Sequence, residues 1–259
     1  MRLAVIADIH ANLPALRAVL DDVAALGCDA VWCAGDVVGR GPHPNEVVEQ
    51  LRMLDIPSVQ GNWDEAVGMA RESTGSSWAS PSADAQGSAS LSWTIERMTD
   101  DNRAWLRTRP VSERFSVDGR SALLFHGSPL KQNEYLWADR PSRYFSRIAS
   151  DEGDDLFCFG HSHETFHRVV GTGHFVAAGS VGCGLPGDAR ARYAVVHIGQ
   201  GEVVVGFRSV AYDRTGVDRD LRAAGLAVEL LGVPPVAHPL EAPATGLEPP
   251  LNPLEPASA

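Results

Sequence analysis

The sequence has few cysteines, one lysine and no long apolar run. Its four cysteines are scattered and none forms a C-x-x-C pair, so neither a disulfide framework nor a cysteine zinc site is indicated, and we expect a reducing, cytoplasmic setting. The first apolar run, Leu3–Ala7, ends at Asp8 without a cleavage site, and no stretch approaches the roughly 20 apolar residues of a membrane span. We therefore expect no secretory signal peptide and no membrane partner.

Basic residues are also scarce. The chain has 22 Lys and Arg against 33 Asp and Glu, a net charge of −11. Binding of duplex nucleic acid depends on a basic surface that neutralises phosphates, so we expect no such partner. Lys131 is the only lysine, which we interpret as a compositional bias towards arginine. With 44% hydrophobic residues, a chain of 259 residues can bury a hydrophobic core that is stable without disulfide bonds.

Strand and helix patterns alternate in the first quarter of the chain. We expect strands at Leu3–Ala7, Ala30–Ala34 and Ile56–Val59, and helices at Pro14–Leu26 and Pro44–Leu54. This order predicts a largely parallel sheet with right-handed crossovers and helices packed on it.

The remaining patterns are less regular. We expect a mobile loop at 73–90 and a helical stretch at Leu91–Leu106, which together form an insert at 73–106. Strands are expected at Ser121–Phe125 and Leu156–Phe159. The chain should then continue in successive antiparallel strands at Thr165–Val170, His174–Ala178, Tyr193–Ile198 and Glu202–Val210. Residues 1–231 are predicted to form one domain. The last 28 residues, Gly232–Ala259, hold eight of the 17 prolines and are predicted to be a poorly ordered tail, whose removal should leave folding and turnover intact.

Side chains of the kind that bind metals follow five of the expected strands. They are Asp8-x-His10, Gly35-Asp36, Gly61-Asn62, His126 and Gly160-His161-Ser162-His163. The carboxyl ends of strands in an open α/β sheet are where ligands collect, and a glycine before the ligand permits a sharp turn over that edge. Each dipeptide alone is common in turns, but the five together in this order predict one shared site.

This array resembles that of the calcineurin-like metallophosphoesterases, whose pattern is D-x-H, G-D, G-N-H-[DE], H and G-H-x-H in that order. The similarity runs over roughly residues 1–210 and is closest to the small bacterial, phosphodiesterase-like branch, through the segments Asp8–Leu16, Gly39–Asn45 and Gly179–Gly182. The resemblance implies a four-layer α/β/β/α sandwich with a dinuclear metal site along the strand ends.

The resemblance also implies a division of the ligands. One metal would take Asp8, His10, Asp36 and His163, and the other would take Asp36, Asn62, His126 and His161, with Asp36 bridging. Mixed imidazole, carboxylate and amide donors suit Mn, our first choice, or Fe, Zn or Ni, and suit Ca or Mg less. A hydroxide bridging the two ions would then attack phosphorus in line, with Asp36 and Asn62 as catalytic residues.

The chain departs from the family pattern at one position. The family's Gly-Asn-His-Asp reads Gly61-Asn62-Trp63-Asp64 here. An indole carries no transferable proton, and general acid catalysis contributes about 10²–10⁴-fold, so esters with poor leaving groups should suffer most. The same histidine is often absent from the phosphodiesterase-like branch, so the departure favours that subclass. Asp64, without a histidine to orient, is expected to cap the following helix.

Four residues are predicted to contact the substrate or supply the acid. We hypothesise that His43 replaces the missing acid and that Arg40 clamps a phosphate oxygen, although each is also typical of a solvated loop. Asn12 and Trp63 are predicted to contact the substrate. Cys183 follows the Gly179–Gly182 segment, and the sequence leaves open whether it faces the pocket or the core.

Together these observations predict a metal-dependent phosphoric ester hydrolase, specifically a phosphodiesterase for a small soluble ester such as a cyclic nucleotide or a dinucleotide. The alternatives are a phosphomonoesterase or protein phosphatase, which the tryptophan makes less favourable, and a non-catalytic scaffold of the same fold. A homo-oligomer is compatible with the sequence, which does not decide it.

Overall fold

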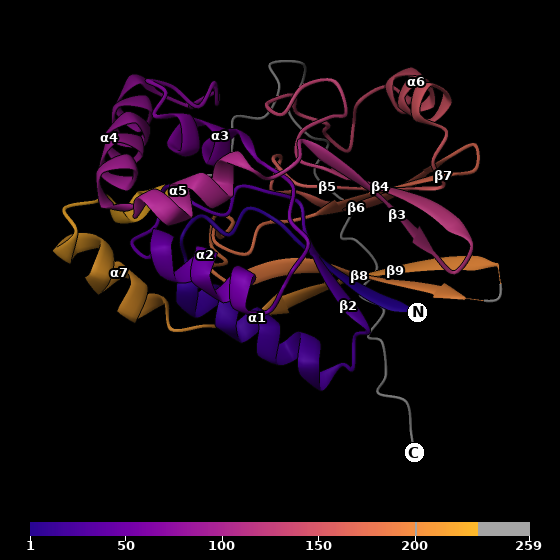
Figure 1. The fold of residues 1–259 in the computed structure, drawn as a ribbon, viewed down its shortest axis with the longest axis horizontal. Helices are drawn as coiled ribbons and strands as arrows, with labels where there is room; N and C mark the ends of the chain where they lie inside the picture. Colours follow the sequence, from indigo (N-terminus) through magenta and orange to yellow (C-terminus); the bar gives the residue numbers. More distant parts are fainter. Residues whose placement is uncertain (200, 233–259) are drawn as a thin grey trace.

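Two β-sheets pack face to face in the computed structural model, which describes residues 1–199 and 201–232 (Figure 1). One sheet has four strands in the order β2-β1-β8-β9, and the other has five in the order β3-β4-β5-β7-β6. The strands are β1 (Arg2–Ile6), β2 (Ala30–Cys33), β3 (Ser112–Val117), β4 (Arg120–Phe125), β5 (Leu156–Phe159), β6 (Thr165–Val170), β7 (Gly173–Ala178), β8 (Ala191–Gly199) and β9 (Glu202–Val210).

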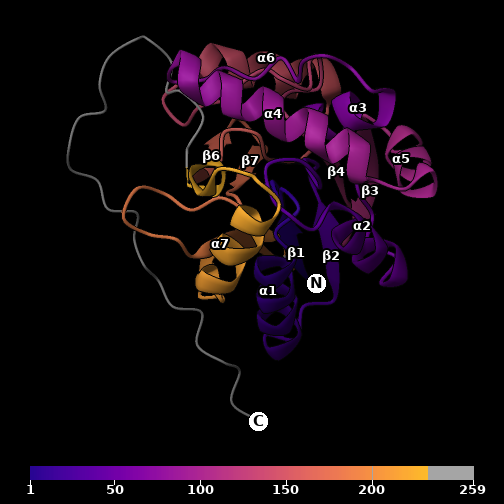
Figure 2. The ribbon, with the colours of Figure 1, turned by 90° about the vertical axis from the view of Figure 1, so that its left-hand side faces the viewer.

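Helices cover the outer faces of both sheets. The helices of the described residues are α1 (Leu13–Ala25), α2 (Pro44–Met53), α3 (Asn62–Met69), α4 (Pro81–Arg97), α5 (Asp100–Arg107), α6 (Ser142–Glu152), α7 (Arg214–Ala223) and the 3-10 helix η1 (Val228–Leu231). In Figures 1 and 2, α1 and α2 lie on the four-stranded sheet and α6 lies on the five-stranded sheet, while α3, α4 and α5 gather at one end. The predicted α/β/β/α sandwich is confirmed.

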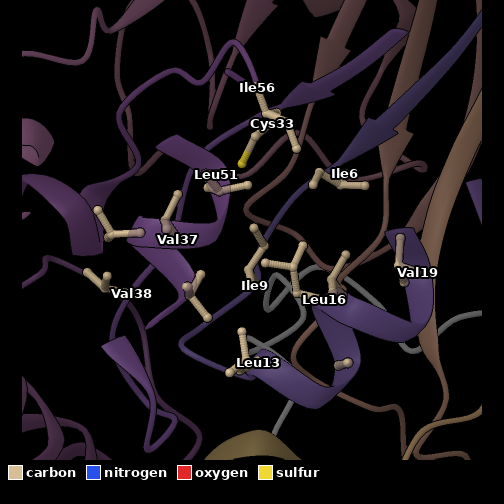
Figure 3. Close-up of a cluster of buried hydrophobic side chains, with 14 of the residues drawn as sticks. Ile6, Ile9, Leu13, Leu16, Val19, Cys33, Val37, Val38, Leu51 and Ile56 are labelled. Carbon is tan, nitrogen blue, oxygen red and sulfur yellow. The ribbon is translucent and has the colours of Figure 1, made fainter. Parts of the chain in front are cut away.

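The strand β1 shows how the layers are built. It is buried on both faces: Leu3 and Val5 point into the layer between the two sheets, whereas Ala4 and Ile6 point towards α1 and α2. Successive side chains of a strand alternate between faces, so a continuous apolar run is what a strand covered on both sides requires. Figure 3 shows Ile6 among the side chains of the helix-facing core.

The helix α1 packs on this sheet through one apolar stripe. Leu13, Leu16 and Val19 are at most 7% exposed and join Ile6 in the cluster of Figure 3. Burying a side chain of this size contributes about 1.5–3 kcal/mol relative to leaving it in water. The predicted helix at Pro14–Leu26 is therefore confirmed within one residue at each end, and so is the helix that begins at Pro44.

The predicted strand at Ile56–Val59 is wrong as a full strand. Only one residue of it, Ser58, forms a bridge with Cys33 of β2. Cys33 exchanges both of its backbone hydrogen bonds with this segment, through the carbonyl of Pro57 and the N–H of Val59. Pro57 has no N–H of its own, so the ladder does not extend.

The predicted antiparallel series is correct in two of its pairs. β6 pairs with β7, and β8 pairs with β9, both antiparallel. Between them the chain changes sheets: β7 lies parallel to β5, and β8 lies antiparallel to β1 in the other sheet. A period-2 pattern reports that a strand is present but carries no information on which sheet receives it.

The predicted mobile loop at 73–90 is wrong in its second half, because α4 begins at Pro81. Ser80 caps this helix by accepting a hydrogen bond from the N–H of Ala83, and proline occupies the first helical position. A serine cap followed by proline is a typical signal for the start of a helix. The prediction missed it because the stretch is rich in serine, which is also typical of loops. The strand β3 and the helices α6 and α7 were not expected, although Asp118-Gly119, between β3 and β4, is a typical hairpin turn.

Two further expectations concern the chain as a whole. None of the helices in the described ranges is long and apolar enough to cross a membrane. The predicted proline-rich tail falls outside the described residues from Val233 onwards.

Candidate metal centre

The ligand-type side chains all lie where strands of the two sheets end. Asp8 and His10 follow β1 and Asp36 follows β2 in the four-stranded sheet, whereas His126 follows β4 and His161 follows β5 in the other. All seven predicted ligands are buried, between 0% and 3% exposed: Asp8, His10, Asp36, Asn62, His126, His161 and His163. The structure therefore brings residues from both sheets to one shared, enclosed position.

Carboxylate oxygens and imidazole nitrogens converge there. Asp8 Oδ1 lies 3.4 Å from His163 Nε2, 3.9 Å from His10 Nε2 and 4.0 Å from His126 Nε2. Asp36 Oδ2 lies 3.4 Å from His126 Nε2 and 3.8 Å from His10 Nε2. His10 Nε2 and His163 Nε2 are only 3.3 Å apart. These separations direct the donors at a common centre, and they also place each carboxylate within ion-pair distance of an imidazole.

Two groups of donors share the carboxylate of Asp36. The ligand atoms of Asp8, His10 and Asp36 lie within 4.8 Å of one another, and so do those of Asp36, His126 and His161. The amide oxygen of Asn62 lies 3.1 Å from His126 Nε2 and joins the second group. A carboxylate common to two donor groups is the arrangement expected of a bridging ligand.

The residues present fit divalent cations. Asp8 Oδ1, His161 Nε2 and His163 Nδ1 are buried and have no hydrogen-bond partner among the described residues. A buried polar atom without a partner costs about 1–3 kcal/mol, and a bound cation would remove that cost for an acceptor. The donors are nitrogen and oxygen, the set that Mn, Fe, Zn and Ni accept.

The pKa values of the four imidazoles diverge. Burial lowers the pKa of His10 and His161 well below the usual value, and the neighbouring charges of Arg40 and His126 add to this effect. Burial would also lower the pKa of His126 and His163, but nearby carboxylates outweigh it. Asp36 and Asp8 raise the pKa of His126 to about 9, and Asp8 raises that of His163 to about 9. The carboxylates thus hold positive charge at this position, which a metal ion would supply in place of protons.

Glycines let the ligand-bearing turns come close together. Gly35, before Asp36, has φ +87°, and a Cβ there would lie 2.7 Å from the backbone nitrogen of Gly61. A Cβ on Gly61 would in turn lie 2.2 Å from Asp36 Oδ1. Glycine is therefore required at both turns by the space available, and at Gly35 by the backbone conformation as well.

Asp64 links these turns. Its Oδ2 accepts a hydrogen bond from the N–H of Gly61 at 2.9 Å, and its Oδ1 accepts from Val37 and Val38 at 2.9 and 3.2 Å. The contact with Gly61 caps α3, as predicted from the sequence. The contacts with Val37 and Val38, which the sequence did not reveal, hold the loop after Asp36 against that cap.

Backbone groups orient the ligands themselves. His126 Nδ1 lies 2.7 Å from the carbonyl oxygen of Ala34, so Nδ1 carries the proton and Nε2 faces the donors. Asp36 Oδ1 accepts from the N–H of Trp63 at 2.9 Å, and Asp8 Oδ2 accepts from the N–H of His161 at 2.9 Å. Each carboxylate keeps its second oxygen for the centre. Such contacts fix the ring tautomer and the orientation of a metal ligand.

Asn12 has partners inside the protein. Its Nδ2 donates to the carbonyl oxygen of Gly182 at 2.9 Å and to Tyr212 Oη at 3.2 Å, and its Oδ1 accepts from the N–H of Ala15. The side chain is 0% exposed. Its observed contacts fix the start of α1 to the loop of Gly182, and both of its amide protons are used there.

His43 lies at the start of α2 and points to α7. Its Nε2 is 3.3 Å from Asp220 Oδ2, and its backbone N–H donates to the carbonyl oxygen of Ala11. Its side chain is 20% exposed, whereas the ligands are buried. The described polar contact of the ring is thus with α7, and the structure does not bring it into the ligand cluster.

Arg40 and Trp63 pack beside the centre. Arg40 is 4% exposed, and its guanidinium carbon lies 5.7 Å from the centre of the Trp63 ring and 4.8 Å from that of Trp78. Trp63 is 1% exposed and meets the ring of His10 edge-on at 5.9 Å. Its indole nitrogen has no hydrogen-bond partner among the described residues.

A short segment within the loop predicted at 73–90 contacts the ligands, which the sequence did not indicate. Residues 74–77, which we call the cover segment, bind the far side of Asn62: its Nδ2 donates to the carbonyl oxygen of Thr74 and to Ser76 Oγ, both at 3.0 Å. These bonds leave the amide oxygen facing His126. The N–H of Ser77 donates to the hydroxyl of Tyr135 at 3.4 Å, and the Tyr135 ring stacks on His161 at 4.0 Å.

Comparison with known proteins places this fold and site in a family. The model of the calcineurin-like phosphoesterase superfamily domain matches residues 1–201. The chain therefore belongs to the calcineurin-like phosphoesterase superfamily, and membership implies a hydrolase of phosphate esters that uses divalent metal ions.

Individual relatives share most of the chain. The metallophosphoesterase of Sphaerobacter thermophilus has a crystal structure with a TM-score of 0.68 and 29% identity, covering 89% of this chain and 97% of that one. The PH1004 protein of Pyrococcus horikoshii OT3 has a TM-score of 0.77 at 22% identity, covering 89% and 96%, and shows the shared fold. MJ0912 of Methanocaldococcus jannaschii is 34% identical over 166 residues, and this chain spans 63% of its length.

Proposed function

We propose that the chain is a dinuclear-metal phosphodiesterase that hydrolyses a small soluble ester, of the cyclic nucleotide or dinucleotide type. The observation that supports it best is the position of Asp36, whose carboxylate belongs to both groups of buried donors. One ion would be held by Asp8, His10, Asp36 and His163, and the other by Asp36, Asn62, His126 and His161. Bound divalent cations would neutralise the phosphoryl oxygens and acidify a water molecule.

The side chains around the donors favour a diester. Trp63 stands where the family has a histidine, and its ring is buried against His10 rather than turned to a substrate. An indole cannot protonate a leaving oxygen, so turnover should depend on the stability of the leaving group. Arg40, beside the centre, supplies a permanent positive charge for a phosphate oxygen. His43 stays the proposed acid, and its contact with Asp220 would have to open for that role.

A polar cavity of about 340 Å³ adjoins the centre at Asn62. Its lining includes the polar residues Ser128, Lys131 and Asn133. A hollow of this size suits the polar portion of a small ester rather than a protein substrate. A larger hollow of about 610 Å³, between α1 and the edge strand β2, is lined by none of the seven ligands.

Parallel hydrolysis of bis-p-nitrophenyl phosphate and p-nitrophenyl phosphate with Mn²⁺ tests this function. Both esters release the same chromophore, so the two rates differ only through diester or monoester chemistry. We expect the diester to be the better substrate and Asp36→Asn to abolish its turnover. Asp139→Asn, at an exposed aspartate, is the matched control and should keep the wild-type rate.

The other outcomes are equally informative. Dominant monoester turnover would contradict the phosphodiesterase proposal and favour the phosphomonoesterase alternative, with His43→Ala as the next variant. No turnover of either ester by protein that holds two ions per chain, followed by none across a panel of cyclic and linear dinucleotides, would favour the non-catalytic scaffold.

A further inference from the structure

A cysteine lies among the donors of the metal centre. The sulfur of Cys183 and the ligand atoms of His10 and His163 lie within 4.8 Å of one another. Cys183 is 1% exposed, so its thiol is enclosed with them. The ring of His163 is 3% exposed, and its Nδ1 has no hydrogen-bond partner among the described residues. Three buried donors at this separation form a group that could hold a metal ion.

The loop of Cys183 is fixed to the segment that bears Asp8 and His10. Ser180 Oγ donates to the carbonyl oxygen of Asp8 at 2.9 Å, and the N–H of Gly182 donates to the same oxygen at 2.9 Å. The N–H of Cys183 then donates to Ser180 Oγ at 2.9 Å. A Cβ on Gly182 would lie 2.0 Å from the carbonyl oxygen of Ile9, so the two segments are in direct contact. The sulfur is therefore held in place by the same backbone that positions the ligands.

The charge around the sulfur also suits a thiolate donor. Arg40 Nη1 lies 3.8 Å from Cys183 Sγ and faces it with a permanent positive charge. The sulfur also lies 3.9 Å from the carbonyl oxygen of Leu230 and is hydrogen-bonded to the ring of His163. A thiol that binds a metal releases its proton, and a neighbouring guanidinium stabilises the anion that remains.

We propose that Cys183 is a sulfur donor to the metal position formed by His10 and His163. The inference rests on the metal site of the proposed function but not on the ester that is hydrolysed. Thiolate is a softer ligand than carboxylate or amide oxygen, so this position selects Zn²⁺, Fe²⁺ or Co²⁺ over Mn²⁺. The position of Asp36, Asn62, His126 and His161, with nitrogen and oxygen donors only, discriminates less between these metals. When Zn²⁺ and Mn²⁺ are both supplied, Cys183 therefore raises the share of Zn²⁺ at the position of His10 and His163.

Cobalt spectroscopy tests the donor directly. The metal-free full chain is titrated with Co²⁺, and a thiolate bound to Co²⁺ adds a sulfur-to-metal charge-transfer band in the near ultraviolet to the visible d–d bands. We expect that band in the wild type and its loss in Cys183→Ser and Cys183→Ala, with the d–d bands retained. Cys28→Ser removes a half-buried thiol remote from the centre and should leave the spectrum unchanged. Circular dichroism confirms that each variant is folded.

Competition between metals gives a second readout. We expect Cys183→Ser to weaken Zn²⁺ binding by about tenfold or more and to change Mn²⁺ binding little. Visible d–d bands without the charge-transfer band in the wild type would overturn the role of Cys183 while leaving the metal site of the proposed function intact. No Co²⁺ binding at all would overturn both.

Discussion

At the scale of single residues, the ligands occupy backbone conformations that side chains rarely adopt. Five of the seven have positive φ, between 47° and 67°: Asp8, His10, Asp36, His161 and His163. The left-handed region costs a non-glycine residue of the order of 1–3 kcal/mol, although Asp and His tolerate it better than most. Such strain persists only where the surroundings fix it. Here backbone hydrogen bonds join the turns after β1 and β2 and the loop of Gly182, and the N–H of His161 donates to Asp8 Oδ2. The turns are thus shaped for metal binding at the expense of local stability.

The orientation of Asn62 gives a prediction at this scale. Ser76→Ala removes one of the two acceptors of its Nδ2 and leaves the other, the carbonyl of Thr74, in place. The amide oxygen should then be held less firmly, and the affinity for a metal ion at the group that includes Asn62 should fall by about tenfold. Calorimetric metal titration measures this. Ser82→Ala, at an exposed serine beyond the same segment, is the control, and equal affinities in the two variants would contradict the role of Ser76.

The histidine pair of β6 and β7 gives a prediction on pH. His167 Nε2 lies 3.1 Å from His174 Nδ1. Burial lowers the pKa of both rings from the usual value of 6.5, and His174 adds to the effect on His167. The unfolded chain therefore takes up these protons first as pH falls, so the pair makes the protein lose stability below about pH 6.5.

Urea unfolding of the metal-free chain at pH 7.5 and 5.5 measures this loss. We expect His167→Phe to lose less stability between the two pH values than the wild type does. His197→Gln, an exposed histidine of β8, should behave as the wild type. An unchanged pH dependence in His167→Phe would show that the loss arises elsewhere.

At the scale of elements, the turns after β1, β2, β4 and β5 are positioned by one another, and Gly35 tests this. Gly35 and Gly119 have nearly the same backbone conformation, φ +87° and +80°, but a Cβ on Gly119 meets nothing within 4 Å. Gly119→Ala should cost about 1 kcal/mol of unfolding free energy from backbone strain alone. Gly35→Ala adds a clash with the backbone of Gly61 and should cost more than about 4 kcal/mol. Equal losses in urea unfolding would show that the close approach is not needed.

Prediction from sequence succeeds where a local pattern decides the structure. The apolar stripe of α1 and the doubly buried run of β1 specify their elements, and the order of metal-type residues after the strands predicts one site. Prediction from sequence fails where contacts between distant segments decide how strands pair. Ser58 pairs with only one residue of β2, and β8 joins β1 rather than β7 although its own pattern resembles that of its neighbours in sequence.

The parts of the site that went unnoticed share a cause. Thr74 and Ser76 act on Asn62 from 12 and 14 residues away, and Asp64 binds Val37 and Val38 across 27 and 26 residues. Serine and threonine in a polar stretch are also typical of loops, so their composition predicts no particular partner. Only the fold shows that these residues meet, and it equally shows that Asn12 and His43 have partners elsewhere.

At the scale of the whole molecule, the metal centre joins the two sheets. Asp8, His10 and Asp36 come from the four-stranded sheet, and His126, His161 and His163 come from the five-stranded sheet. Away from the centre the sheets meet through apolar side chains such as Leu3, Leu124 and Val196. A bound ion would therefore add a link between two layers that also meet through these apolar side chains and through hydrogen bonds such as that from the N–H of His161 to Asp8 Oδ2, and it would bind only when both layers are in place.

Metal loading should consequently raise the melting temperature. One ion at about 100 times its Kd adds about 2.7 kcal/mol, which corresponds to roughly 5–10 °C for a domain of this size. Differential scanning calorimetry with chelator or with excess metal measures the shift. In Asp36→Asn the shift should be much smaller, because the shared carboxylate is lost. Identical melting temperatures with and without metal would contradict a link between the sheets.

The single lysine offers a practical consequence. Lys131 lies in the lining of the cavity beside Asn62. The other Lys or Arg positions of the sequence are all arginine, whose guanidinium group does not react as an amine. An amine-reactive fluorophore would therefore attach at the chain's amino terminus and at one internal position only. That position borders the proposed substrate cavity, so the unaltered protein already carries a unique handle from which an emission change can report what enters.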